Sequence, residues 1–175
     1  MATKNDITGD TIQSKVASKQ YRDNFADIFR KPKMSNYFLF LDDLRIPSQA
    51  WLEKPNKDSS GIKLTVISGI EEDKWVIVRT YDEFVATLEA RGIPMVVSFD
   101  HDLHEEHIFH YFKNTQDTGI VEYGNLQHKT GLACAQKLID MWQKTDKSVK
   151  PTIYIHSANK YGKRNIQELL DNHLR

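Results

Sequence analysis

Three short apolar runs in this chain each end abruptly in polar residues that carry chemistry. Residues 37–41 stop at an aspartate pair, residues 95–99 stop at Asp-His-Asp, and residues 152–155 stop at His-Ser. Apolar runs of this length indicate buried strands. Because the carboxyl ends of parallel strands open onto one crevice, we expect the polar residues after the three runs to share one edge of a sheet.

Segments with helical spacing alternate with these runs. A capping pattern, Thr-Tyr-Asp-Glu, and a closing Arg-Gly predict a helix over 81–91. A second apolar stripe predicts a helix over 130–142, and a third helix is expected to end the chain. Residues 62–67 and 75–80 are expected to form two further strands joined in a hairpin, after a long loop over 44–61. This alternation predicts an α/β domain with mainly parallel pairing.

Residues 1–33 differ in composition from the rest of the chain. Lys, Asp, Thr, Ser and Gln dominate as far as residue 20, and such a segment cannot bury enough apolar surface to fold alone. Apolar residues at helical spacing then predict a short amphipathic helix, which docks either on the body or on a protein partner: Tyr21, Phe25, Ile28 and Phe29. We therefore expect a flexible extension over 1–33 and one folded domain over 34–175.

The composition narrows the class of protein. The 175 residues suit one domain with a tail, and the formal net charge of zero argues against strong binding to duplex DNA. No apolar segment approaches the length of a membrane span or of a signal-peptide core, which favours a cytoplasmic protein. The single cysteine, Cys134, lies within an apolar helical pattern and is expected to serve in packing.

The acidic residues after the first two runs are candidate metal ligands. Asp42 and Asp43 follow the first run, and Asp100 and Asp102 follow the second. Clustered carboxylates at such an edge hold hard divalent cations, so we expect Mg²⁺ or Mn²⁺. A solvated strand end or a helix cap is the alternative for the first pair. Two clusters after two different strands favour the metal.

Three polar residues of this edge are candidates for catalysis. Asp100 suits a nucleophile as well as a ligand, and His101 and His156 suit general acids or bases. The alternative for His101 is a histidine that only orients the turn. Residues that suit phosphate binding follow the first and third runs: Arg45, Ser157, Asn159, Gly162, Lys163 and Asn165. An ordinary strand–loop–helix connection or, for the arginine, a structural ion pair is the alternative.

A long polar segment, residues 103–129, follows the second acidic cluster and shows no clear periodicity. Segments of this kind are often functional. It contains His104, His107 and His110, which are spaced three residues apart. The two histidines of a zinc-protease helix are four residues apart, so the spacing does not match. We therefore expect a solvated face or a lid here.

Several separated motifs resemble the cyclic-phosphate processing receiver-like domains, which are relatives of two-component receiver domains. The resemblance covers about residues 36–175 and rests on these segments: LFLDDLRIP at 39–47, SFDHDL at 98–103, Thr130-Gly131, HSAN at 156–159, Gly162 and Asn165-Ile166. It implies a three-layer receiver-like or flavodoxin-like domain. By position, Asp42 and Asp43 correspond to the acidic metal pair of a receiver, and Asp100 corresponds to its phosphoacceptor. His156-Ser157 ends the strand where a receiver has its hydroxyl residue.

The chain departs from the family pattern at His104, where a glycine is common, and at Lys160, where a proline is common. The extension over 1–33 lies outside the resemblance. It looks like the leading segment of some small phage-encoded proteins, which is a loose similarity.

Three functions follow from the resemblance. The first is a metal-dependent phosphoesterase that processes a cyclic phosphate, either an RNA 2′,3′-cyclic end or a cyclic nucleotide. The second is a binding module that sequesters a cyclic nucleotide signal without cleaving it, as a phage protein acting against a nucleotide-based defence would. The third is a degenerate receiver that acts through a protein partner by means of its N-terminal helix.

Overall fold

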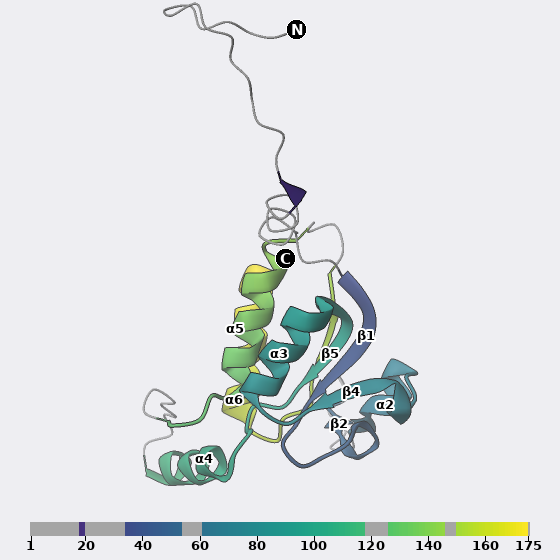
Figure 1. Ribbon diagram of the computed structural model, residues 1–175. Coiled ribbons are helices and arrows are strands. Elements are labelled where there is room, and N and C mark those ends of the chain that lie inside the picture. The colour runs from purple at the N-terminus through teal and green to yellow at the C-terminus, as the bar shows by residue number, and fades with distance from the viewer. Residues whose placement is uncertain (1–17, 20–33, 54–60, 118–125, 146–149, 175) are drawn as a thin grey trace, which may run out of the picture. The chain divides into compact units, whose positions relative to one another are not determined.

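The computed structural model describes residues 18–19, 34–53, 61–117, 126–145 and 150–174 (Figure 1). The amphipathic helix predicted near Tyr21 lies outside these residues and stays a prediction. In the described part of the chain, no helix combines the length and the apolar character that crossing a membrane requires.

Four parallel strands form the central sheet, in the order β4-β1-β5-β6. They are β1 (Met34–Leu41), β4 (Trp75–Val78), β5 (Ile93–Phe99) and β6 (Thr152–Ile155). The register aligns their carboxyl ends, because Leu41 lies opposite both Val78 and Phe99, and Phe99 lies opposite Ile155. The polar residues that follow β1, β5 and β6 therefore emerge at the same level of the sheet. This is the shared edge that the apolar runs predict.

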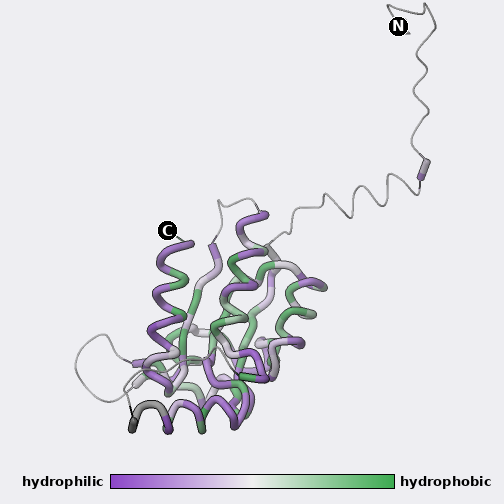
Figure 2. Tube along the Cα trace, turned by 90° about the vertical axis from the view of Figure 1, so that its left-hand side faces the viewer, coloured by the Kyte–Doolittle hydropathy of each residue, from purple (hydrophilic) through white to green (hydrophobic). Residues whose placement is uncertain are grey.

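Three helices cover one face of the sheet: α3 (Tyr81–Arg91), α5 (Gly131–Trp142) and α6 (Lys160–His173). Apolar residues of the strands and of these helices form the main core: Leu39, Leu41, Val97, Phe99, Phe84, Cys134, Leu138 and Ile166. Figure 2 shows the matching pattern, with hydrophobic strands and helices that alternate between hydrophobic and hydrophilic residues. Thr80 is the N-cap of α3, and its side chain accepts a hydrogen bond from the Glu83 N–H at 3.2 Å, as the capping pattern predicts.

The other face is covered by a compact segment between β1 and β4. It contains η1 (Pro47–Gln49), β2 (Trp51–Leu52), β3 (Ile62–Lys63), α2 (Leu64–Ser68) and η2 (Glu72–Lys74). A second apolar cluster joins it to the sheet: Phe40, Ala50, Leu52, Leu64 and Trp75. Helices on one side and this segment on the other give the three-layer α/β domain expected from the sequence.

The predicted hairpin between residues 62–67 and 75–80 is wrong. Strand β3 pairs antiparallel with β2, while β4 pairs parallel with β1. Most of the first run is helical instead, as α2. Only Leu64 of that helix is buried, and Val66 and Ile67 are exposed, so the run provides one anchor for the second cluster and has no strand partner of its own.

Residues 103–129 contain a helix that their weak periodicity does not reveal. Helix α4 (Glu105–Asp117) lies apart from the three-helix layer, near the beginning of α6 (Figure 1). Its apolar residues Ile108, Phe109 and Phe112 are exposed, so this helix does not pack into the main core as α3, α5 and α6 do. Strand β1 also begins earlier than the predicted residue 37, because Met34 and Ser35 extend the pairing with β5 across an irregularity in register.

Candidate functional site: an acidic cavity at the edge of the sheet

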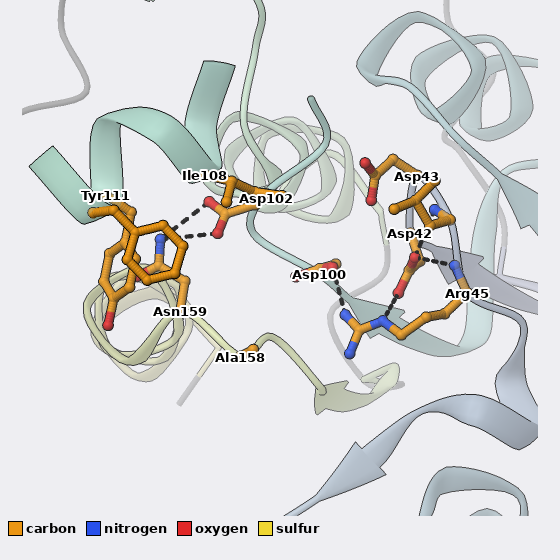
Figure 3. A pocket seen from close by; sticks show the side chains of 11 residues that line it. Asp42, Asp43, Arg45, Asp100, Asp102, Ile108, Tyr111, Ala158 and Asn159 are labelled. Atoms are coloured by element: carbon orange, nitrogen blue, oxygen red, sulfur yellow. Dashed lines mark hydrogen bonds and ion pairs between the residues drawn. The ribbon is translucent and has the colours of Figure 1, made fainter. Parts of the chain in front are cut away.

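A cavity of about 430 Å³ opens at the carboxyl edge of the sheet (Figure 3). The loops after β1, β5 and β6 form one part of its wall, and α4 forms the other. The lining residues are Asp42, Asp43, Leu44, Arg45, Asp100, Asp102, Ile108, Tyr111, Phe112, Ala158 and Asn159. Of the sequence candidates, all four aspartates, Arg45 and Asn159 thus line one space.

Asp42 is the best-anchored acidic residue of the site and is fully buried. Its Oδ1 accepts the backbone N–H groups of Leu44 at 2.9 Å and Arg45 at 2.5 Å. Its Oδ2 accepts the Arg45 Nε–H at 2.6 Å and a ring N–H of His156 at 3.0 Å. All four lone-pair positions of this carboxylate are therefore in use.

The Arg45 guanidinium joins the two acidic clusters (Figure 3). Besides its bond to Asp42, its Nη2 lies 2.5 Å from Asp100 Oδ2. The Arg45 side chain is 31% exposed, whereas those of Asp42 and Asp100 are 0% and 8% exposed. The guanidinium thus reaches from the cavity to two buried carboxylates and neutralises part of their charge.

The pKa values follow this arrangement. Burial acts to raise the pKa of Asp42, but hydrogen bonds from His156 and Arg45 outweigh burial and lower it to about 2. Burial also acts to lower the pKa of Arg45, and the nearby Asp100 and Asp42 raise it instead. Burial raises the pKa of Asp43, and the charges of Asp42 and Asp100 raise it further. Asp43 therefore lies in negative potential that the guanidinium does not fully offset.

Arg79, which the sequence did not mark as a site residue, hydrogen-bonds to the loop after β1 that carries Asp42 and Asp43. Its Nη1 donates to the backbone carbonyls of Asp42 at 2.8 Å and Arg45 at 2.5 Å. Arg79 follows β4, beside β1, so the register of the sheet places its guanidinium under the loop. No local motif marks this role, because an arginine after a strand is an ordinary residue in sequence.

His156 lies behind the cavity wall and is 2% exposed. Its Nε2 donates a hydrogen bond to Asp42, and its Nδ1 lies 2.7 Å from Ser98 Oγ. Because the ring proton is then on Nε2, Nδ1 is an acceptor and the Ser98 hydroxyl is the donor. The imidazole also stacks on Phe40, with ring centroids 4.6 Å apart. Every polar atom of this ring has a partner in the protein, and the ring orients Asp42.

His101 is also buried, below the loop that carries Asp100 and Asp102. Its Nδ1 lies 2.7 Å from Asp102 Oδ1. A Cβ on Gly162 would lie 2.2 Å from the imidazole Cγ, so this position requires glycine for close packing on the ring. In the structure Gly162, a predicted phosphate-binding residue, packs against His101.

Gly131 also contacts the loop that carries Asp100 and Asp102. The sequence predicted no role for it in the site beyond its place in a motif. Its N–H donates to the His101 carbonyl at 2.8 Å. A Cβ here would lie 1.8 Å from the Asp100 carbonyl oxygen, so no other residue fits without moving the acidic loop. Close packing against Gly131 and Gly162 thus fixes the position of Asp100 and Asp102 at the sheet edge.

Asn159 connects the third loop to the second. Its Nδ2 donates to Asp102 Oδ1 and Oδ2 at 3.0 and 3.2 Å, and its Oδ1 accepts the N–H of Gly162 as the N-cap of α6. Ser157 Oγ accepts the Asn159 N–H at 3.2 Å. Asp102, expected among the metal ligands, therefore has Asn159 and His101 as partners (Figure 3).

Four of the six residues expected to bind phosphate do not line the cavity: Ser157, Gly162, Lys163 and Asn165. The Lys163 ammonium lies 3.0 Å from the Glu53 carboxylate. Asn165 lies one turn further into α6 and is half-buried. Ser157 is buried and contacts the backbone of its own loop. Lys163 and Asn165 lie within α6 and Ser157 lies in the loop before it, so closeness to Asn159 in sequence does not bring these side chains to the cavity.

Helix α4 supplies an apolar wall that sequence reasoning did not assign. Ile108, Tyr111 and Phe112 line the cavity, and the Phe112 side chain is 58% exposed. The Tyr111 ring lies 6.2 Å from the Tyr161 ring of α6, measured between centroids. The cavity therefore has a charged wall on the sheet edge and an aromatic wall on α4.

The donor set fits one divalent cation, with a restriction. Asp42, Asp100 and His156 offer ligand atoms within 4.8 Å of one another. In the structure, however, the Arg45 guanidinium bridges Asp42 and Asp100, and His156 is committed to Asp42 and Ser98. Asp43 forms no ion pair with a described cationic side chain, and Asp100 keeps lone pairs for a further ligand. Asp43 and Asp100 are thus the carboxylates with capacity to bind a metal.

Comparison with curated proteins and with solved structures finds no match. A family model described as "Cyclic-phosphate processing Receiver domain" matches residues 37–172. The matched range includes the whole sheet edge and every residue that lines the cavity. It leaves out the extension over 1–33, whose similarity to phage proteins stays a prediction. With a match over most of its length, the chain belongs to the cyclic-phosphate processing receiver domain family.

Proposed function

We propose that the acidic cavity binds the cyclic phosphate of a nucleotide or of an RNA 3′ end and hydrolyses it with the help of a divalent cation. The observation that carries the proposal is the pairing of two unlike walls around one space of about 430 Å³. Ligand cavities are typically about 300–1,000 Å³ and combine apolar surface with a few placed polar groups.

The aromatic wall supports a nucleotide as the class of substrate. Ile108, Tyr111 and Phe112 provide apolar and ring surface opposite the charged loops. Aromatic side chains stack on nucleobases of any sequence. A base on this wall directs the ribose phosphate toward Arg45, whose guanidinium is suited to phosphoryl oxygens by its planar donors.

The charge of the other wall supports a requirement for a cation. Four aspartates and one arginine line the cavity among the described residues, so a phosphate anion entering it alone would be repelled. Asp43 and Asp100 would hold Mg²⁺ or Mn²⁺, both of which bind oxygen ligands. When bound, such an ion polarises the phosphoryl group and makes a nearby water a stronger nucleophile.

The side chains of the chain itself then have three tasks. Arg45 binds phosphoryl oxygens and orients the phosphorus. Asp102, held by Asn159 and His101, takes a proton from the attacking water. A bond forms from the water oxygen to phosphorus, the bond from phosphorus to one ribose oxygen breaks, and that oxygen takes a proton from solvent. His101 and His156 act by positioning Asp102 and Asp42, since burial keeps both rings from the substrate.

The experiment is a turnover assay with 2′,3′-cyclic-phosphate oligonucleotides and cyclic mono-, di- and trinucleotides, with Mg²⁺, with Mn²⁺ and with a chelator. We expect a metal-dependent product that Asp100→Asn and Asp43→Asn each reduce by about 100-fold or more, the scale of losing a catalytic or metal-binding group. Asp73→Asn, an exposed aspartate far from the cavity, is the matched control and should keep full activity. Full activity in folded Asp100→Asn would reject the proposal.

Sequestration without cleavage is the second candidate, and one observation favours it. The two histidines best suited to proton transfer are buried, and Arg45 bridges the carboxylates that a catalytic metal would use. Under this hypothesis the protein retains the nucleotide intact. Recovery of uncleaved ligand after denaturation of the complex, at one ligand per chain, would identify a binding module.

A further inference from the structure

A second group of metal-binding side chains lies outside the acidic cavity, at the beginning of α4. His104 precedes the helix, Glu106 is in its first turn, and His128 lies in the segment before α5. Each offers one ligand atom, and these atoms lie within 4.8 Å of one another. The group joins two segments that are 22 residues apart, as counted from Glu106 to His128, which is why no local motif reveals it.

The three side chains are already oriented by the surrounding hydrogen bonds. The Glu106 carboxylate accepts the backbone N–H groups of Gln127 at 3.0 Å and His128 at 3.3 Å. It also lies 2.9 Å from His128 Nδ1. His104 Nδ1 accepts the Glu106 N–H at 3.2 Å, so its Nε2 is the ring nitrogen left to bind a metal. Backbone N–H groups thus hold both the Glu106 carboxylate and the His104 ring.

The two imidazole rings stack, with centroids 3.8 Å apart and planes at 13°. Both His side chains and the carboxylate are accessible from solvent, with His104 and His128 exposed.

We propose that His104, Glu106 and His128 form a zinc site that links the beginning of α4 to the segment before α5. Two imidazole nitrogens and one carboxylate oxygen are a donor set typical of Zn²⁺, with a fourth position left for water. This chemistry differs from that of the cavity, whose oxygen ligands suit Mg²⁺ or Mn²⁺.

The site has a structural consequence for the cavity wall. His107, one residue after Glu106, is buried, and its Nδ1 accepts the Leu103 N–H while its Nε2 donates to the His128 carbonyl. A metal that binds His104 and His128 would reinforce these two links. Because Ile108 and Tyr111 follow in the same helix, the zinc site would hold the aromatic wall in place.

The test is a titration of the full chain with Zn²⁺ by calorimetry, after removal of metal with a chelator. We expect saturation at one zinc per chain from this site, weakened more than about tenfold in His104→Ala and in His128→Ala, since loss of even a supporting partner costs a metal site that much. His173→Ala, an exposed histidine at the end of α6, is the matched control and should bind zinc as the wild type does.

Two further measurements separate loss of zinc binding at this site from unfolding of the variant and from zinc binding in the acidic cavity. Circular dichroism should show each variant folded, and zinc should shift the ring resonances of His104 and His128 in the wild-type spectrum. Zinc uptake that persists in His104→Ala and in His128→Ala but is lost in Asp43→Asn would place the ion in the acidic cavity and overturn the proposal. Absence of saturable zinc uptake by the wild type would also overturn it.

Discussion

The protein carries two groups of histidines that have the same kind of partner and opposite surroundings. His101 and His156 are buried, and each lies beside an aspartate, at 2.7 and 3.0 Å. His104 and His128 are exposed, and His128 lies 2.9 Å from a glutamate. In all three pairs, a ring nitrogen faces a carboxylate oxygen. The difference lies in the access of water and in the number of further contacts that hold each ring.

This difference decides what each group can do. The His156 ring, whose two nitrogens both have partners, cannot turn to meet a new ligand without leaving polar atoms unpaired, which is costly. An exposed ring can exchange a hydrogen bond for a metal ligand at little cost, because water satisfies the atoms that it releases. The buried histidines therefore position carboxylates, and the exposed ones are available for binding. Burial and partner number, more than residue type, separate the two roles.

The largest expected effect is on stability, from His156→Ala. This change removes the ring stacked on Phe40, takes one of four hydrogen bonds from Asp42, and removes the partner of Ser98 Oγ. Replacing a buried aromatic ring by alanine costs about 3–5 kcal/mol, so we expect the free energy of unfolding to fall by that amount. Urea denaturation followed by circular dichroism measures it. His173→Ala, at an exposed position, should change the same quantity by less than about 0.5 kcal/mol. Equal stability of the two variants would remove the distinction between the groups.

His107 tests the comparison from an intermediate position, because it is buried like the first group and lies in α4 like the second. Burial lowers its pKa from the ordinary 6.5, against an opposing effect of its hydrogen bond to His128. As the pH falls below 6.5, the unfolded chain takes up a proton before the folded chain does. The free energy of unfolding should therefore fall as the pH drops from about 7.5 to 5.5.

His107→Gln is the matched variant, since an amide can still accept from the Leu103 N–H and donate to the His128 carbonyl. Its stability should depend less on pH over this window than that of the wild type. Urea denaturation of both proteins at several pH values gives the difference. Identical pH profiles would show that protonation of His107 does not contribute to the loss of stability.

Much of the fold could be predicted because the strands of a parallel sheet are buried on both faces and appear as apolar runs. Residues 37–41, 95–99 and 152–155 have this character, and the structure contains a strand at each. Residues 62–67 look similar, but most of them form α2, since only Leu64 packs into the core. A short apolar run does not distinguish a strand from a helix turn when its partner lies far away in the chain.

The site could be predicted only as far as strand ends determine it. Asp42 and Asp100 follow strands that end at one level, so the register brings them together, and Arg45 joins them. The contributions of Arg79 and Gly131 depend on distances between loops that are remote in sequence. Lys163 is close to Asn159 in sequence, but its ammonium pairs with Glu53 and it does not line the cavity.

The smallest expected effect is that of His104→Ala in the absence of metal. The ring is exposed; it accepts a hydrogen bond from the Glu106 N–H, stacks on His128 and meets the edge of the His107 ring. Water can replace the hydrogen bond, so we expect the free energy of unfolding to change by less than about 0.5 kcal/mol. With zinc present, the wild type should gain stability by mass action while the variant should not, because only the wild type binds zinc tightly in its folded state. Urea denaturation with and without zinc measures both differences. A large loss of stability without metal would assign His104 a packing role like that of the buried histidines.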